Sequence, residues 1–286
     1  MDCLRSDDLV GIGMEADAVR RRLHPEGVAS YAVGARLEWP CAGAEDGAFF
    51  RAGELAVEAG ATGLQIAGTV DGGRVDGTLR ELRRHVPGAW IEALTADEVV
   101  RLGSAWGMGL REAMTRLVEA GLDSIAPDGP DLREGWAEWM AVHRAAHEAG
   151  MRTRAGMVFG SGEALEQRVD FLAAVRRLQE KTGGFAAFVP IAARPASGRE
   201  LDGVTAVERL KTLAVARMFL DNVENAEAVR AGDGLKVLQT ALRFGANDAG
   251  AVTPEGSREE DVRRVIRDAG FRPAQRDAAY RVRMLG

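Results

Sequence analysis

The chain has 286 residues, 46% of them hydrophobic and 28% charged, and its 37 Lys and Arg against 43 Asp and Glu give a formal net charge of −6. This composition excludes a disordered chain and argues against nucleic acid as the partner, because binding phosphates needs a basic surface. The two cysteines, Cys3 and Cys41, exclude a disulfide scaffold and any metal site built from three or four thiolates. The sequence contains no apolar run long enough to span a membrane, and residues 1–27 contain no apolar signal core, so we expect a cytoplasmic protein.

Short apolar runs alternate with longer segments of helical periodicity along the chain. A helix is predicted over 7–23, and a first strand over 28–39, which is rich in Val, Tyr and Leu. Further strands are predicted, in chain order, at 63–67, 89–94, 124–126, 152–159, 185–192, 226–229 and 245–251. Helices are predicted between the strands at 47–59, 79–85, from 95 onward, 110–120, 136–149, 163–182, 205–220 and 234–243, and a last helix at 258–269.

Eight strands that are nearly all separated by helices are typical of parallel β-α-β units. We therefore predict an α/β protein whose eight units close into a (β/α)8 TIM-type barrel, with a doubly wound open sheet as the alternative. No linker rich in Pro and Ser divides the chain. We expect an N-terminal helical extension over 1–27, the barrel over 28–257, and a C-terminal helical appendix over 258–286 that packs on the barrel.

In a barrel, the functional residues lie at the C-terminal ends of the strands. We expect several polar or charged residues and one proline at these ends, namely Glu92, Asp123, Ser124, Arg154, Pro190, Arg194, Glu227, Asn247 and Asp248. Position alone names no reaction for them.

Six blocks of sequence are long and ordered enough to compare with known families. They are EAGLDSI (119–125), AHEAGMRTRAGMVFG (146–160), LQEKTGGFAAFVPIA (178–192), LKTLAVARMFLDN (210–222), GLKVLQTALRFGANDAGA (234–251) and VRRVIRDAGFRPAQRD (262–277). Together they resemble the radical-SAM enzymes of the futalosine route to menaquinone. The last block favours the dehypoxanthine futalosine cyclases, with the aminofutalosine synthases and F0 synthases as more distant relatives. This resemblance implies a (β/α)8 barrel, in agreement with the strand count.

The family has a cluster-binding loop after the first strand, and this chain departs from it. Family members carry a Cys-x3-Cys-x2-Cys motif there, whose three thiolates hold a 4Fe–4S cluster that binds and cleaves S-adenosylmethionine. The matching loop here begins at Cys41 and places Glu45 and Ala48 at the other two ligand positions. One thiolate does not hold such a cluster. We therefore expect no 4Fe–4S cluster and no other metal, with Cys41 as a relict ligand or a small buried residue, while binding of S-adenosylmethionine stays open.

Seven residues are candidates for a functional site. Asp131 and Asp248 are the candidate catalytic carboxylates, and the candidate ligand-binding residues are Gln65, Gly129, Arg154, Arg243 and Asn247. Gly129 and Asp131 stand where the family has a Gly-Gly-Gly-Ala-Glu turn implicated in binding S-adenosylmethionine. Asp131 has an alternative role as a helix cap, and the Asn247-Asp248 pair has one as a simple turn.

We expect the pocket between the loop of Cys41 to Ala48 and the Asn247-Asp248 turn. Asp131 and Asp248 are predicted to approach it from different sides, with Arg154 to offset their charge or to hold an anionic group of a ligand. The remaining motif is a helical pair four residues apart, His143 and His147. The sequence lacks the Glu of an H-E-x-x-H zinc motif, so we predict that this pair is a surface feature.

The first functional hypothesis is a radical-SAM-like pseudoenzyme related to menaquinone biosynthesis that has lost its cluster. It would bind a nucleoside-like pathway intermediate or assist a menaquinone-pathway enzyme. The alternatives are an enzyme of the same pathway with non-radical acid/base chemistry, and an active radical-SAM cyclase with an atypical cluster. If side chains fill the pocket, the accessory role is favoured over the enzyme.

Overall fold

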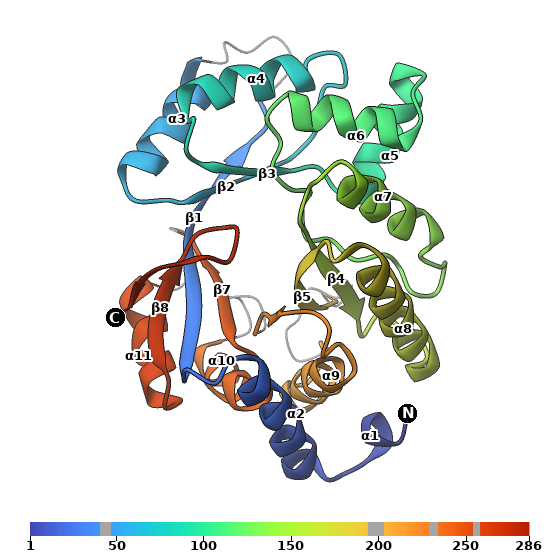
Figure 1. The fold of residues 1–286 in the computed structure, drawn as a ribbon, viewed down its shortest axis with the longest axis vertical. Coiled ribbons are helices and arrows are strands. Elements are labelled where there is room, and N and C mark those ends of the chain that lie inside the picture. The colour runs from blue at the N-terminus through green and yellow to red at the C-terminus, as the bar shows by residue number, and fades with distance from the viewer. Residues whose placement is uncertain (41–46, 194–202, 229–233, 254–257, 286) are drawn as a thin grey trace.

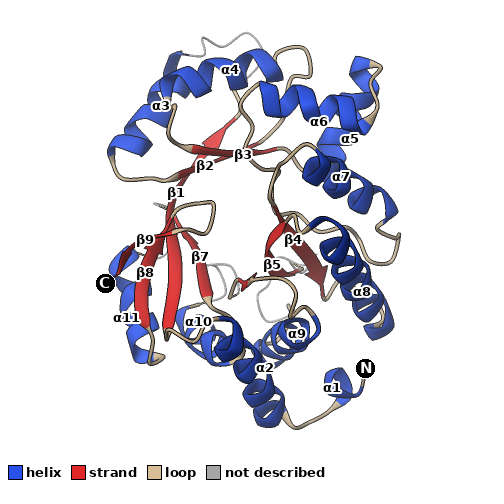
Figure 2. Ribbon diagram, in the orientation of Figure 1, coloured by secondary structure: helices blue, strands red, loops and turns tan. Residues whose placement is uncertain are grey.

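The computed structural model describes residues 1–40, 47–193, 203–228, 234–253 and 258–285, and helices surround a strongly curled sheet in it (Figures 1 and 2). The strands are β1 (Val28–Glu38), β2 (Gly63–Ala67), β3 (Trp90–Ala93), β4 (Thr153–Phe159), β5 (Phe185–Ala192), β6 (Asn225–Ala226), β7 (Asp248–Val252), β8 (Arg272–Arg276) and β9 (Val282–Leu285). The helices are α1 (Asp2–Arg5), α2 (Leu9–Leu23), α3 (Gly47–Glu58), α4 (Val75–His85), α5 (Ala96–Trp106), α6 (Leu110–Glu119), α7 (Ala137–Glu148), α8 (Leu165–Thr182), α9 (Ala206–Phe219), α10 (Leu235–Arg243) and α11 (Glu259–Asp268).

The strands form two sheets. The larger one has the order β3-β2-β1-β8-β9, with β7 also paired to β1, and the smaller one has the order β4-β5-β6. Within these sheets every pair is parallel except β8–β9. A single-residue bridge at Glu227–Asp248 joins the end of β6 to β7 of the larger sheet, and another, Glu92–Ser124, pairs β3 with the segment after α6. The α/β class and a curled parallel sheet are therefore confirmed, while closure into a complete (β/α)8 barrel stays a prediction.

The C-terminal segment differs from the predicted helical appendix, because the hairpin β8–β9 follows α11. The length of β1 explains the hairpin. β2 pairs only with its second half, Gly34 to Glu38, and β8 pairs with its first half, Val28 to Ala32. Backbone N–H and C=O groups in a strand need partners when they are buried, so the first half of β1 provides the edge on which β8 forms.

Two predicted strands are shorter than expected. The segment 124–126 is reduced to the bridge at Ser124, and the strand predicted at 226–229 is Asn225–Ala226, with residue 229 outside the described residues. Pro127 comes directly after the segment 124–126. Because a proline has no backbone N–H, it cannot extend the hydrogen bonding of a strand.

The core lies between the sheet and the surrounding helices. Along β4, Ala155, Met157 and Phe159 are fully buried members of this core, together with Phe171 of α8. The intervening β4 residues point to the opposite face, toward the centre of the curl, as the two-residue period of a strand requires. Arg154 is therefore directed inward.

Two glycines allow the segment before α7 to cross the inner face of β4. A Cβ on Gly156 would overlap the carbonyl oxygen of Asp128, and a Cβ on Gly129 would lie 2.6 Å from the backbone nitrogen of Val158. Gly129, a predicted ligand-binding residue, is thus placed against β4 by close backbone packing.

We predict that Gly156→Ala destabilises the fold by about 1–3 kcal/mol, because the added methyl forces the crossing segment away from β4. Urea unfolding followed by circular dichroism measures this change. Gly77→Ala is the matched control, since nothing lies within 4 Å of a Cβ at Gly77 in α4. Equal midpoints for the two variants would contradict the packing described here.

Candidate functional site

A buried guanidinium lies at the centre of the curled sheet. Arg154, the second residue of β4, donates from Nη2 to both carboxylate oxygens of Glu92 at 2.5 and 2.6 Å, and from Nη1 to Oε1 of Glu227 at 3.0 Å. Gln65 lies opposite Glu92 in the β2–β3 register, and its Nε2 donates to Oε1 of Glu92 at 2.8 Å. One arginine therefore connects β4 with carboxylates on β3 and just after β6.

A second ion pair lies beside the first. Arg276, at the end of β8, donates from Nη2 to Oδ1 of Asp248 at 2.7 Å and from Nε to Oδ2 of the same residue. Asp248 is fully buried and also accepts from Ser30 Oγ at 2.5 Å. Because Nη2 of Arg276 lies 3.6 Å from Oε1 of Glu227, the two pairs form one network.

The turn of the β8–β9 hairpin completes this network. The hydroxyl of Tyr280 donates to Oε1 of Glu227, and the guanidinium of Arg276 lies 3.8 Å from the centre of the Tyr280 ring. Tyr280 has φ +64°, a left-handed conformation that is uncommon for a residue with a side chain. Asp277 holds the turn by accepting from the backbone nitrogens of Ala279 and Arg281 at 2.9 and 3.0 Å.

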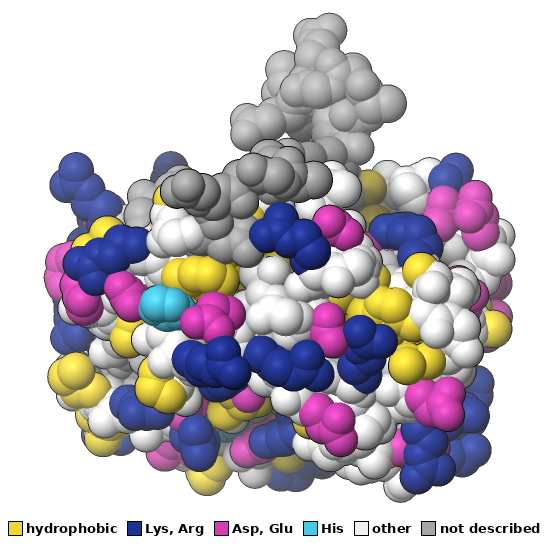
Figure 3. Space-filling view, turned by 90° about the horizontal axis from the view of Figure 1, so that it is seen from above, with side chains coloured by type: hydrophobic (Ala, Val, Ile, Leu, Met, Phe, Trp, Pro, Cys, Tyr) yellow, Lys and Arg dark blue, Asp and Glu magenta, His cyan; other side chains and the backbone are white. Residues whose placement is uncertain are grey.

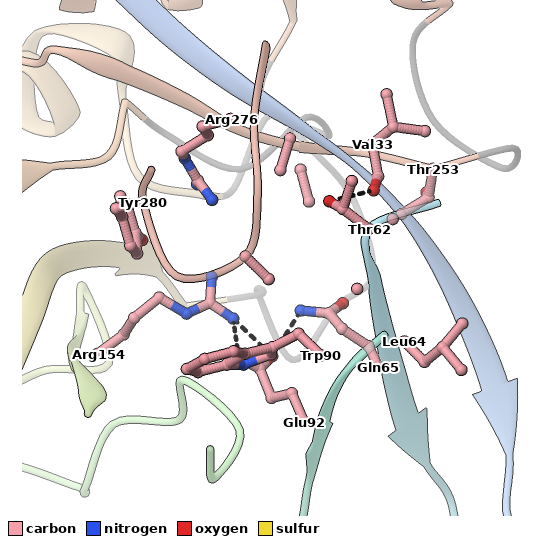
Figure 4. Close-up of a pocket in the computed structure, with 15 residues that line it drawn as sticks. Val33, Thr62, Leu64, Gln65, Trp90, Glu92, Arg154, Thr253, Arg276 and Tyr280 are labelled. Atoms are coloured by element: carbon pink, nitrogen blue, oxygen red, sulfur yellow. Dashed lines mark hydrogen bonds and ion pairs between the residues drawn. The ribbon is translucent and has the colours of Figure 1, made fainter. Parts of the chain in front are cut away.

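A small cavity of about 40 Å³ borders the network, lined by Gln65, Trp90, Glu92, Arg154, Arg276 and Tyr280 among others (Figure 4). A smaller space of about 10 Å³ shares Trp90, Glu92, Arg154 and Tyr280 with it.

The charges of the network stabilise one another. Burial raises the pKa of Glu227, but Arg154 and Arg276 outweigh burial, so that this pKa is lowered. Burial and the neighbouring Glu227 raise the pKa of Tyr280 well above its usual value, so the phenol is neutral at pH 7. Three carboxylates then face two guanidinium groups, which leaves one net negative charge.

Of the other predicted site residues, Asp131 and Arg243 lie apart from this network, whereas the carbonyl oxygen of Asn247 accepts from the backbone nitrogen of Ser30 at 2.9 Å. Asp131 binds its neighbour Arg133, which lowers the pKa of Asp131 to about 2 through its side chain and then its backbone N–H. Arg243 lies with its guanidinium 4.9 Å from the Phe271 ring. Asn247 accepts from the backbone nitrogen of Ala226 at 2.9 Å and so fixes β7 beside β6.

The predicted position at the C-terminal strand ends is wrong for two residues. Asp248 is the first residue of β7, and Arg154 is the second residue of β4. The helix α10 ends at Arg243, and Gly245 reverses the chain with φ +98°, so β7 begins only at Asp248. Cys41, Glu45 and Arg194 lie outside the described residues, and Ala48 is exposed near the start of α3.

The sequence pattern missed three members of the network, namely Ser30, Arg276 and Tyr280. Arg276 lies in the block FRPAQRD that carries part of the resemblance, and this is the one signal that pointed to it. It was missed because β8 was not predicted.

The prediction that His143 and His147 form a surface feature is wrong. His143 is fully buried and lies 2.8 Å from Thr153 Oγ1 through Nδ1. His147 contacts Thr182 Oγ1 at 2.7 Å and Thr153 Oγ1 at 2.9 Å. Gly184 makes this possible, because a side chain there would overlap the His147 ring. Among the described residues no group of three His, Cys, Asp or Glu is placed to hold a metal ion.

We predict that His147 makes the fold sensitive to acid. Burial lowers its pKa from 6.5 to about 4, so its contribution to stability is complete above pH 6.5 and is lost as the pH falls toward 4. Between pH 7.5 and 5 the loss from this residue is about 2 kcal/mol. Urea unfolding of wild type and His147→Gln at both pH values measures the effect; the same loss in both proteins would assign the acid sensitivity to other groups.

We also predict that Arg276→Met destabilises the fold by about 3–5 kcal/mol, because Asp248 is left buried without its partner. Arg281→Met, in the same hairpin, is the control. The Arg276 side chain is 4% exposed and that of Arg281 is 74% exposed, so the second change costs about 1 kcal/mol or less. Chemical denaturation of both variants measures the difference, and losses of similar size would show that the network contributes little.

Comparison with known proteins places the chain among characterised sequences. A family model described as the CofH/MqnC C-terminal region matches residues 182–286. The chain is 34% identical to the aminodeoxyfutalosine synthase of Thermus thermophilus, over 71% of this chain and 63% of that protein. It is 28% identical to the cyclic dehypoxanthine futalosine synthase of Streptomyces coelicolor, over 98% of this chain and 83% of the relative.

A third relative is the 5-amino-6-(D-ribitylamino)uracil–L-tyrosine 4-hydroxyphenyl transferase of Methanothermobacter thermautotrophicus, 30% identical over 79% of this chain and 71% of that one. The match spans 63% of the length of the aminodeoxyfutalosine synthases of Thermus thermophilus and Streptomyces coelicolor. Among solved structures, 3-dehydroquinate dehydratase from Geobacillus kaustophilus has a TM-score of 0.52 at 17% identity, covering 84% of this chain and 91% of that one, which shows likeness of fold alone. No helix among the described residues is long and apolar enough to cross a membrane.

Proposed function

This chain belongs to the CofH/MqnC family of radical-SAM proteins, and from that relationship we propose that it is a cluster-free, non-catalytic accessory protein of the futalosine route to menaquinone. The observation that carries the proposal is the ion network. The centre of the curled sheet is occupied by charged side chains that bind one another, namely those of Arg154, Glu92, Glu227, Asp248 and Arg276. We expect that the strands around this network form the complete (β/α)8 barrel of the family.

The donor set of this chain does not fit a 4Fe–4S cluster. The chain has two cysteines, and a cluster of this kind is held by Cys thiolates. Ala48, at one of the three ligand positions, has no atom that binds iron. Cys3 is exposed on α1, which packs against α9 and lies far from α3 in Figure 1.

The described carboxylates also argue against acid/base catalysis. A general base works best with a pKa near the working pH and a free site for the proton. Glu227 and Asp131 have lowered pKa values and bind arginines. Burial raises the pKa of Asp128 to about 6, but its two oxygens accept from Ala96 N and Trp139 Nε1, at 2.9 and 3.2 Å. These groups are better suited to holding the structure than to moving protons.

The surface offers contacts for a protein partner. Val10 and Met14, which are four residues apart on α2, are 70% and 66% exposed. On the face shown in Figure 3, Lys and Arg side chains are interspersed with Asp and Glu side chains, a pattern that suits a protein partner better than nucleic acid. We propose that the partner is an enzyme of the same pathway.

The first test is iron. Protein reconstituted anaerobically with iron and sulfide is expected to lack the brown absorption at about 400 nm that thiolate-bound clusters give. An aminodeoxyfutalosine synthase treated in parallel is the positive control. About four irons per chain, with that absorption, would overturn the cluster-free assignment.

The second test is the partner. Purified protein is mixed with the aminodeoxyfutalosine synthase and the cyclic dehypoxanthine futalosine synthase of its own source organism, and complexes are measured by size-exclusion chromatography and calorimetry. We expect a complex with one of them, weakened by Met14→Glu, and no product when this protein is incubated alone with their substrates. Product formation by the isolated protein, or no complex with either enzyme, contradicts the accessory role.

A further inference from the structure

A groove of about 360 Å³ opens on the outer side of β1, between α3 and α11. Val33 and Ala35 line it and lie on the same face of β1 as Tyr31, because side chains alternate along a strand. The hydroxyl of Tyr31 donates to Oε1 of Glu259, on the outer helix α11, at 2.7 Å. Ser30, on the opposite face of β1, binds the buried ion network. The groove is therefore separate from the centre of the curled sheet.

The groove exists because two helices cover different parts of one long strand. The helix α3 packs on β1 and β2, whereas α11 packs on β7 and β8. β8 pairs with the first half of β1 and β2 pairs with its second half, so α3 and α11 lie apart along β1 (Figure 1). On the α3 side the groove is lined by Ala56, Ala59 and Ala61, whose side chains are too short to close it. Its volume lies within the range of small-molecule sites.

One end of the groove carries a positive charge without a partner among the described residues. The first turn of α11 has three carboxylates, and each contacts an arginine of the same helix, namely Glu259 with Arg263, Glu260 with Arg267, and Asp261 with Arg264. Arg258 directly precedes this helix, lines the groove and is exposed. No acceptor binds its guanidinium in the part of the chain that the structure describes. An anionic group of a ligand would therefore meet an available arginine there.

The rest of the lining is aliphatic. Val33, Ala35 and Val252 contribute apolar side chains, and no aromatic side chain lines the groove among the described residues. An aliphatic chain gains free energy when its surface leaves water for such a lining. A guanidinium binds a carboxylate through charge-assisted hydrogen bonds. The two features together suit a molecule with an aliphatic chain and a carboxylate head.

We propose that this groove is a binding site for a free aliphatic carboxylate, whose chain lies over Val33 and Ala35 and whose head pairs with Arg258. The inference rests on the groove and its unpaired arginine. It is independent of the accessory role, so the iron and partner experiments do not decide it.

The first test is calorimetric titration with decanoate below its micelle-forming concentration. We expect saturable binding, and binding of hexanoate that is weaker by about tenfold or more, because the shorter chain removes less apolar surface from water. Ala59→Phe fills the groove and is expected to lower decanoate affinity by about tenfold. Ala52→Phe is the matched control, since Ala52 is exposed on the same helix α3 and lies outside the lining of the groove. If thermal melting shows that Ala59→Phe does not fold, Ala59→Leu replaces it.

The second test concerns the carboxylate head. Arg258→Met is expected to lower decanoate affinity by about fivefold and to leave the affinity for the uncharged 1-decanol unchanged. Arg264→Met, which removes an exposed arginine that already contacts Asp261, is the matched control and is expected to bind decanoate as wild type does.

Three results would overturn the proposal: no saturable binding of decanoate, equal decanoate affinity in wild type and a folded Ala59 variant, or an equal loss for decanoate and 1-decanol in Arg258→Met. A dimer of the wild type that Ala59→Phe dissociates would also overturn it, because the groove would then hold a second copy of the chain.

Discussion

The pairing of Arg154 with Glu92 and Glu227 is the interaction on which the interior of this molecule depends. Arg154 belongs to the smaller sheet and Glu92 to the larger one, and among the described residues the backbone bridge between these sheets is the one at Glu227–Asp248. A buried charge without a partner costs several kcal/mol, so each carboxylate stays where the arginine holds it. These ion pairs therefore act together with the backbone contact between β6 and β7 in fixing the relative position of the two sheets.

The same constraint explains the C-terminal hairpin. Glu227 is almost completely buried, and a single arginine leaves it with unsatisfied hydrogen-bonding capacity. The hairpin turn supplies the phenol of Tyr280, and the end of β8 supplies Arg276. The left-handed conformation of Tyr280 costs about 1–2 kcal/mol, and the hydrogen bond to Glu227 with the stacking on Arg276 offsets it. The strained turn is therefore stable because its tyrosine completes the buried ion network.

The sequence predicted the parts of this fold that depend on local pattern. The alternation of apolar runs and helical periods located the strands around Leu64, Ile91 and Met157, because each is a buried strand bounded by polar turns. β8 was missed because its sequence, Arg-Pro-Ala-Gln-Arg, has little strand character, and its pairing depends on an edge of β1 far away in the chain. For the same reason Arg276 could not be connected with Asp248: an ion pair between residues 28 positions apart follows from register, which no local pattern encodes.

For the candidate site, too, the sequence pattern identified residues but not their partners. Asp248 was selected by resemblance and Arg154 by its charge and its expected place near a strand end. Both belong to the network, but their role depends on partners that only the fold reveals. Glu227, Asp248, Arg276 and Tyr280 lie within the residues matched by the C-terminal family model, whereas Glu92 and Arg154 lie outside them. The matched region therefore contributes one part of a shared buried network. Separated at residue 182, it would expose Glu227 without Arg154, so the two parts of the described chain are held together by charge as well as by the sheet.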